Sequence, residues 1–163
     1  MPPQLPVPYT RHQIVPAHQA RDRGGITAFV SSQEQKGDWE LPRLYRIACV
    51  LGSVVADLRE ARIPEGEVQV EVFLVLGSIE LFVPPGVRVE LSVHTFAGEA
   101  AYHPDPLYFS EPGAPVLRVT GSAYFGSVEV IARLPGESAR DAKRRLKASA
   151  KAASQAASRQ IGR

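Results

Sequence analysis

The chain has 163 residues, of which 44% are hydrophobic, with 14 prolines, 13 glycines, one cysteine and a formal net charge of +2. This length and composition predict one turn-rich globular domain with a substantial core, and the lone Cys49 excludes a disulfide framework and a cysteine-based zinc site. No positive n-region precedes an apolar run and no apolar stretch is long enough to span a membrane, so we expect a cytoplasmic protein.

Residues 1–23 form a Pro-rich segment, with five prolines among the first 20 positions. Proline fixes φ and lacks a backbone donor, so we expect a flexible or extended arm. The alternative is that the arm docks as a polyproline II helix on an aromatic groove of a partner.

Residues 24–136 predict a body of short strands. The clearest stretch, residues 68–86, has the sequence VQVEVFLVLGSIELFVPPG, with apolar side chains at every second position and a bend at Gly77. Trp39 and Leu41 are expected to point into the core. Strands are predicted over residues 24–30, 44–51, 52–58, 68–76, 79–83, 87–93, 117–120 and 125–131, with a turn over 31–39, a corner over 56–61 and an irregular stretch over 102–115.

An apolar-Gly-Ser pattern repeats along this body. It begins at Leu51, Leu76 and Phe125, while residues 96–99 (FAGE) are a degraded copy and residues 29–32 (FVSS) a copy without glycine. The predicted corner glycines, separated by 25, 21 and 28 residues, are Gly52, Gly77, Gly98 and Gly126. Such spacing predicts an all-β solenoid of stacked strands, in which each unit packs only against its neighbours. A β-sandwich of about nine short strands is the alternative.

Residues 137–163 predict a basic, Ala-rich helix, because good helix formers follow one another without Gly or Pro until Gly162. Ser138 followed by Asp141 is typical of a helix N-cap. This segment carries a net charge of +6, which leaves −4 for residues 1–136. The helix is expected either to cap the open end of the solenoid or to pack against another helix in an oligomer. Its candidate interaction residues are Arg140, Lys143, Arg144, Arg145, Lys147 and Lys151.

Two polar groups contain side chains that catalysis or metal binding use: Asp57, Arg59 and Glu60 at a corner, and His94, Glu99, His103 and Asp105 around a turn. The first group lacks a nearby histidine or nucleophile, so we interpret it as a salt bridge rather than an acid–base pair. The second matches no ligand signature, and a turn is the preferred interpretation over a metal site. No phosphate loop or dinucleotide fingerprint is present. We therefore predict no enzyme activity, no catalytic residues, no cofactor and no metal.

Four motifs resemble the C-terminal domain of LiaF-type cell-envelope stress proteins. They are KGDWELP at 36–42, LGSVVADLREA at 51–61, GSIELFVPPGVRV at 77–89 and TGSAYFGSVEV at 120–130. The resemblance covers roughly residues 24–134 and implies a right-handed "toast-rack" β-solenoid with a sensory or protein-interaction role and no enzyme activity. It also makes Trp39 and Pro84 structural corner residues. LiaF-type proteins carry transmembrane helices before this domain, where this chain has its Pro-rich arm.

Three hypotheses about function follow. The first is a scaffold module that self-associates into a dimer or filament through the solenoid ends and the basic helix, because open strand edges tend to pair. The second is a soluble envelope-stress regulatory module that binds a signalling protein. The third is binding of nucleic acid or an anionic membrane surface through the basic helix.

Overall fold

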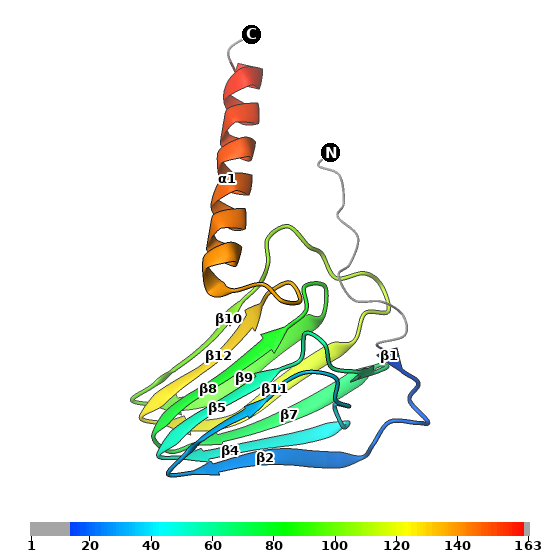
Figure 1. Ribbon diagram of the computed structural model, residues 1–163, viewed down its shortest axis with the longest axis vertical. Coiled ribbons are helices and arrows are strands. Elements are labelled where there is room, and N and C mark those ends of the chain that lie inside the picture. The colour runs from blue at the N-terminus through cyan, green and yellow to red at the C-terminus, as the bar shows by residue number, and fades with distance from the viewer. Residues whose placement is uncertain (1–13, 162–163) are drawn as a thin grey trace.

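The computed structural model of the protein describes residues 14–161 (Figure 1). Two five-stranded sheets, in which all strand pairs are parallel, face each other across the core, and one helix, α1 (Ala139–Ile161), stands away from them (Figure 1). The predicted all-β, solenoid-like fold with a C-terminal helix is confirmed.

Each strand of one sheet continues through a corner of one or two residues into a strand of the other sheet, and we call each such pair a rung. The first sheet contains, in spatial order, β2 (Arg23–Phe29), β4 (Leu44–Val50), β7 (Glu67–Leu74), β11 (Val116–Tyr124) and β9 (Arg88–Phe96). The second contains, in spatial order from the same end, β3 (Ser32–Gln35), β5 (Gly52–Asp57), β8 (Gly77–Val83), β12 (Gly126–Ala132) and β10 (Glu99–His103).

The core lies between the sheets and is built from the alternating apolar positions. Val70 and Val72 of β7 face Ile79 and Leu81 of β8 across the same layer of core, and all four side chains are buried. Burying one such aliphatic side chain contributes about 1.5–3 kcal/mol, so the repeated alternation is what holds the two sheets together.

The four predicted corner glycines lie at the corners, stacked on one another. Gly52, Gly77 and Gly126 are direct partners in the second sheet, and Gly98 lies against Gly126. A Cβ on Gly77, whose φ is +137°, would overlap the carbonyl oxygen of Gly52 in the adjacent rung. Neighbouring strands are only about 4.8 Å apart, so glycine is required where these backbones meet.

The rungs do not stack in the order of the sequence. The chain passes from β8 to β9 and β10, which form the end of the stack, and then returns to insert β11 and β12 beside β7 and β8. In the simplest solenoid consecutive turns stack on one another, and the order here differs from that arrangement. The irregular residues 104–115 provide the length needed for the return, which a short turn could not span.

The predicted turn over residues 31–39 is wrong in part. Residues 32–35 form β3, which pairs in parallel with β5. Their sequence, SQEQ, lacks apolar alternation because β3 is the edge strand of its sheet. A rung is present on only one side of β3, so its inner face is less completely covered than that of the central strands. Backbone hydrogen bonds to β5 therefore define this strand, and periodicity does not.

The loops opposite the corners close the core at that end. Leu41 is fully buried, and the Trp39 indole packs against Tyr45 with ring centroids 5.3 Å apart and donates a 2.9 Å hydrogen bond to the Asp57 carbonyl. Pro84 is buried in the turn after β8. Of the predicted arm, residues 1–13 lie outside the described residues. The short strand β1 (Ile14–Val15) pairs with β6 (Ile63–Pro64).

Candidate interaction surfaces

A line of exposed apolar side chains follows the stacked corners, and we call it the corner ridge. The corners lie one above another at the left of Figure 1. The ridge comprises Phe29, Val30, Leu51, Phe73, Leu76, Phe96, Tyr124 and Phe125, whose exposed fractions run from 42% for Tyr124 to 71% for Phe29. Its aromatic rings contact one another from rung to rung: Phe96 and Phe125 lie edge to face at 5.7 Å, and Phe73 and Tyr124 at 6.3 Å.

Several ridge residues adopt a backbone conformation that favours glycine. Val30, Leu51 and Phe125 have φ values of 49°, 56° and 55°. A left-handed conformation costs an L-residue roughly 1–2 kcal/mol, and a β-branched residue such as valine is rare there. The corners thus carry bulky apolar side chains at positions where Gly or Asn would be more stable both in conformation and in water.

The ridge is bordered by uncharged residues on both sides. On the second sheet the bordering column contains the serines that follow the corners, Ser32, Ser53, Ser78 and Ser127. On the first sheet it contains Thr27, Ala48 and Ser122 around Phe73. Only the end rung departs from this pattern, with His94 and Glu99 in these columns. The ridge is therefore an uncharged apolar strip over four of the five rungs.

A second surface is formed by α1, which starts at the ends of the strands opposite the corners. The predicted cap is present: the Ser138 hydroxyl accepts a 3.2 Å hydrogen bond from the Asp141 amide, and the Ser138 amide donates to the Asp141 carboxylate. The Ser138 hydroxyl also lies 2.6 Å from the Asp141 carboxylate, and its hydrogen bond, together with that from the Ser138 amide, lowers the pKa of Asp141. Between residues 139 and 159, only Ala142, Arg145, Leu146 and Ser149 are withdrawn from solvent, so the outer half of the helix stands clear of the body.

A network of buried charges anchors the base of α1. Arg145 binds the Glu137 carboxylate through two hydrogen bonds of 2.8 and 3.0 Å and donates a 2.6 Å bond to Asp105. The bond from Arg145 lowers the pKa of Glu137, and the two carboxylates raise the pKa of Arg145. Arg59, paired with Asp57 at 2.6 Å, donates to the backbone carbonyl of Glu137 at 2.8 Å.

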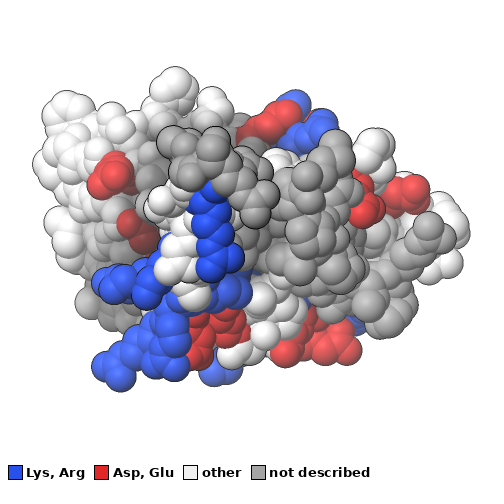
Figure 2. Space-filling model, turned by 90° about the horizontal axis from the view of Figure 1, so that it is seen from above, with Lys and Arg blue, Asp and Glu red and all other residues white. Residues whose placement is uncertain are grey.

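Arg145 therefore differs from the other five candidate interaction residues: its guanidinium holds the helix to the body. Arg140, Lys143, Arg144, Lys147 and Lys151 are all exposed. Their spacing places them within about 100° of one another around the helix, which makes a single cationic stripe. Figure 2, seen along α1 from its free end, shows blue basic side chains gathered on one side of the helix, with red acidic ones beside its base.

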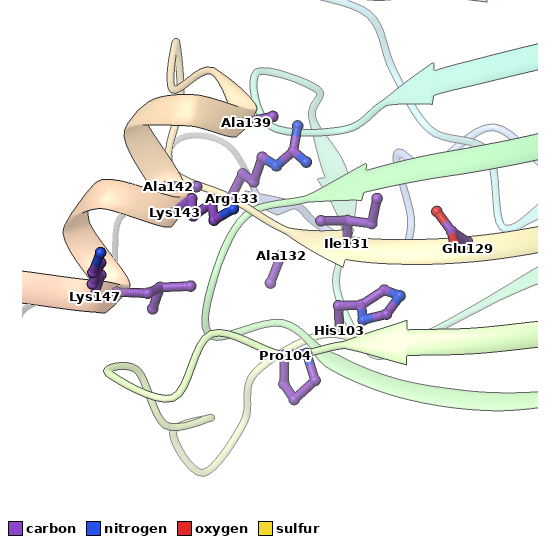
Figure 3. Close-up of a pocket in the computed structure, with 11 residues that line it drawn as sticks. His103, Pro104, Glu129, Ile131, Ala132, Arg133, Ala139, Ala142, Lys143 and Lys147 are labelled. Atoms are coloured by element: carbon purple, nitrogen blue, oxygen red, sulfur yellow. The ribbon is translucent and has the colours of Figure 1, made fainter. Parts of the chain in front are cut away.

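A groove of about 590 Å³ lies between the base of α1 and the ends of β10 and β12 (Figure 3). Its apolar lining is Pro104, Ile131, Ala132, Ala139, Ala142 and Leu146, and its polar lining is His103, Glu129, Arg133, Lys143 and Lys147. The Arg133 guanidinium also lies 4.8 Å from the Phe82 ring centre. Because Lys143 and Lys147 belong to the cationic stripe, the groove and the stripe form one continuous basic surface.

The polar groups considered for chemistry are dispersed or engaged elsewhere. Asp57 and Arg59 form the expected corner salt bridge, and Glu60 is exposed. His94, Glu99 and His103 are exposed along the end rung, while Asp105 is buried against Arg145. Among residues 14–161 no group of three potential metal ligands comes together. Cys49 is buried, and burial raises the pKa of its thiol.

Sequence reasoning missed the corner ridge, although its signal was present. Each copy of the repeat places an apolar residue immediately before its glycine or serine: Val30, Leu51, Leu76 and Phe125. We expected these residues to lie within the predicted strands. The chain reverses at this point, so the side chain points outward from the corner, and alternation along a strand does not apply to it.

The two ends of the stack are a third candidate surface. β2 and β3 end one side and β9 and β10 the other, each with one unpaired edge among the described strands. On the β9 side, the inward residues Val89, Leu91 and Val93 are only partly buried. Of the described part of the chain, no helix is both long and apolar enough to cross a membrane.

Comparison with known proteins finds similar sequences for the β body. Two curated proteins of Mycobacterium tuberculosis, the uncharacterized proteins MT0994 (strain CDC 1551 / Oshkosh) and Rv0966c (strain ATCC 25618 / H37Rv), are 28% and 27% identical over 105 residues. The match covers 64% of this chain and 52% of each relative, so the chain spans about half the length of the curated relatives it matches.

A solved structure described as a "putative cell adhesion protein" from Clostridium sporogenes ATCC 15579 aligns with a TM-score of 0.43 at 9% identity, over 74% of this chain and 97% of that one. Residues 29–106, from the first corner to the loop after β10, match the family model "Cell wall-active antibiotics response LiaF, C-terminal". The resemblance found in the sequence motifs is confirmed: over these residues the chain is similar to the LiaF-like C-terminal family.

Proposed function

We propose that this chain is a non-enzymatic regulatory module of the envelope-stress response that acts by binding a protein partner, either a different protein or a second copy of the chain, through its corner ridge. The family is one of cell-envelope response proteins and is non-enzymatic in kind. The observation that carries the proposal is the ridge, an exposed and uncharged apolar strip at strained corners. Exposed apolar patches of several hundred Å² are characteristic of protein-binding surfaces.

The experiment is site-specific photo-crosslinking in the cells that produce the protein. A photoreactive amino acid replaces Leu76 in the ridge, and in a matched control it replaces Glu65, which is exposed in the loop before β7. We expect a discrete protein adduct from position 76 and none from position 65, with a yield that changes when cell-wall synthesis is inhibited. The absence of any adduct from position 76, or equal yields from both positions, contradicts the proposal.

The adduct mass also identifies the kind of partner. A signalling protein, the partner first expected for a regulatory module, gives an adduct that differs from twice the mass of this chain. Self-association gives twice the chain mass. Both results support binding through the ridge, and they differ only in the occupant.

Self-association through the stack ends and the basic helix is a separate prediction, favoured by the unpaired edges of β2 and β9 and the half-buried Val89, Leu91 and Val93. Such ends can pair strand to strand and extend a stack without limit. Negative-stain microscopy of concentrated protein at low and high salt tests this prediction. Filaments support pairing at the ends, and their loss at high salt assigns the contact to the charges of α1.

A second candidate function is binding of a polyanion, such as nucleic acid or an anionic membrane surface, by the cationic stripe. The observation that favours it is that the stripe lies on one face of a helix whose outer half stands clear of the body. Binding through such contacts weakens steeply with salt. Gel retardation of duplex DNA by the full chain, compared with a Lys143→Glu/Lys147→Glu variant, tests it. Retardation that the variant retains excludes the stripe.

A further inference from the structure

We infer that the occupant of the corner ridge is a second copy of this chain, paired about a two-fold axis. This inference rests on the proposed function, because it names the partner of the surface proposed there. Four properties of the described residues support it: the conformation of the corners, the area of the ridge, the distribution of charge around it and the position of α1.

The first property is the double disadvantage of the corner residues. Leu51 and Phe125 occupy left-handed positions that asparagine or glycine would adopt at lower energy, and their side chains are half exposed. Neither the backbone conformation nor water favours these residues in an isolated molecule. A partner that covers the ridge removes the second disadvantage and explains why side chains of this size are present.

The second property is the area. A whole aromatic side chain presents roughly 150–250 Å². The five aromatic members of the ridge are about half exposed and so offer on the order of 500 Å², to which the three aliphatic members add. Each partner of a standard-size interface contributes about 800 Å², so the ridge has the dimensions of one side of a stable protein–protein contact.

The third property is the absence of charge. In a two-fold contact the same surface meets itself, so any charge near the axis faces a like charge. The ridge and its bordering columns contain no Lys, Arg, Asp or Glu until Glu99 on the end rung. By contrast, the first sheet bears exposed ion pairs such as Arg46–Glu71, and α1 bears the cationic stripe. The ridge is thus the surface best suited to meeting its own copy.

The fourth property is the distance from α1. The helix follows the end of β12 opposite its corner, so pairing through the corners places the two helices at opposite ends of the dimer (Figure 1). Each basic segment carries a net charge of +6, and a dimer formed through α1 would bring two of them together. Pairing through the ridge avoids that repulsion. The position of α1 also keeps the cationic stripe away from the corner ridge. An anionic bilayer would be expected to bind both surfaces at once, so this separation argues against a bilayer as the occupant of the ridge.

The test is sedimentation velocity of the full chain over a concentration series, with ridge and control variants. Leu51→Asn/Phe125→Asn removes two ridge side chains, and asparagine tolerates the left-handed conformation, so the variant should fold as well as the parent. Phe109→Asn is the control, because Phe109 is 72% exposed in the loop between β10 and β11, away from the corners. Thermal unfolding of each variant verifies the fold.

We expect the parent chain to form a dimer, the ridge variant to dimerise roughly 100-fold more weakly or not at all, and the control to match the parent. The effect is large because each substitution occurs twice across the axis. A parent that stays monomeric into the sub-millimolar range overturns the inference, as does a dimer that the ridge variant leaves intact. If the parent is monomeric but position 76 crosslinks to a different protein, the proposed function stands and only the inferred dimer is refuted. If the parent is monomeric and no crosslink forms, the proposed function and the inferred dimer are both refuted.

Discussion

The Arg145→Met substitution tests the buried ion network at the base of α1. Methionine has about the length of the arginine stem but lacks the guanidinium, so Asp105 and Glu137 lose the donor that they share. Their side chains are only 1% and 8% exposed. A hydrogen bond to a charged group contributes about 1.5–3 kcal/mol, and an unpaired buried carboxylate adds a desolvation penalty, so the docked helix loses at least about 3 kcal/mol.

We expect this loss to detach α1 and leave the β body folded. Apart from Arg145 itself, only Ala142, Leu146 and Ser149 of the helix are withdrawn from solvent, and both carboxylates regain water when the helix leaves. The free energy lost by the substitution therefore cannot exceed the free energy with which the helix docks on the β body, because the helix detaches instead. A loss of about 3 kcal/mol corresponds to roughly 100-fold in the equilibrium between docked and detached states.

Hydrogen exchange measured by mass spectrometry is the assay. Amides in the first turns of α1 should exchange roughly 100-fold faster in Arg145→Met, while those of the central strands β7 and β8 keep their protection. Arg144→Met is the matched control, since Arg144 is exposed on the same helix and its loss should change exchange little. Unchanged exchange in α1, or an equal increase across the sheets, would refute the anchoring role.

Three further predictions concern the corner, the helix base and the core. Gly77→Ala should destabilise the fold by about 4 kcal/mol in urea unfolding, because its Cβ would overlap a carbonyl oxygen of the next rung. Gly113→Ala is the control: it has open space around it, so it should lose only about 1–2 kcal/mol, the cost of its positive φ. Acidification should loosen the base of α1: the lowered pKa of Glu137 contributes stability above its ordinary value of 4.5, and that stability is lost as the pH falls through the lowered pKa. Protection factors of the helix amides that are the same at pH 7 and pH 3 would contradict this. The Cys49 thiol, whose pKa is raised by burial, should react with Ellman's reagent only as fast as the chain unfolds, so immediate labelling of native protein would show that it is accessible.

Periodicity predicted the local elements well and the spatial order of the rungs less well. The alternation in residues 68–83 is enforced by a core on one face only, so the sequence carries it directly. The stacking of β11 between β7 and β9 is a long-range pairing choice, and all three strands have the same pattern of inward apolar residues. Nothing local distinguishes one neighbour from the other. Only the length of residues 104–115 pointed to a longer connection.

In the interaction surfaces, too, the local features could be predicted from the sequence and the long-range ones could not. The helix cap at Ser138 and Asp141 depends on residues three apart, and the prediction agrees with the hydrogen bonds found. The role of Arg145 depends on Asp105, 40 residues away, and no sequence pattern distinguishes it from the lysines beside it. The ridge depends on the stacking of corners from five rungs, which becomes visible only when the register is known.

The inserted position of the fourth rung has a consequence for the time course of folding. While the chain is being synthesised, β9 and β10 are complete before residues 116–132 exist, and the open edges of β7 and β8 are the strand edges left by the preceding rungs. The inward residues of β9 have the same period as those of β11, so pairing of β9 directly with β7 is a stable competitor to the native order. The native fold requires that this pairing be undone or never form. We therefore expect the placement of the last two rungs to limit the rate at which the domain folds.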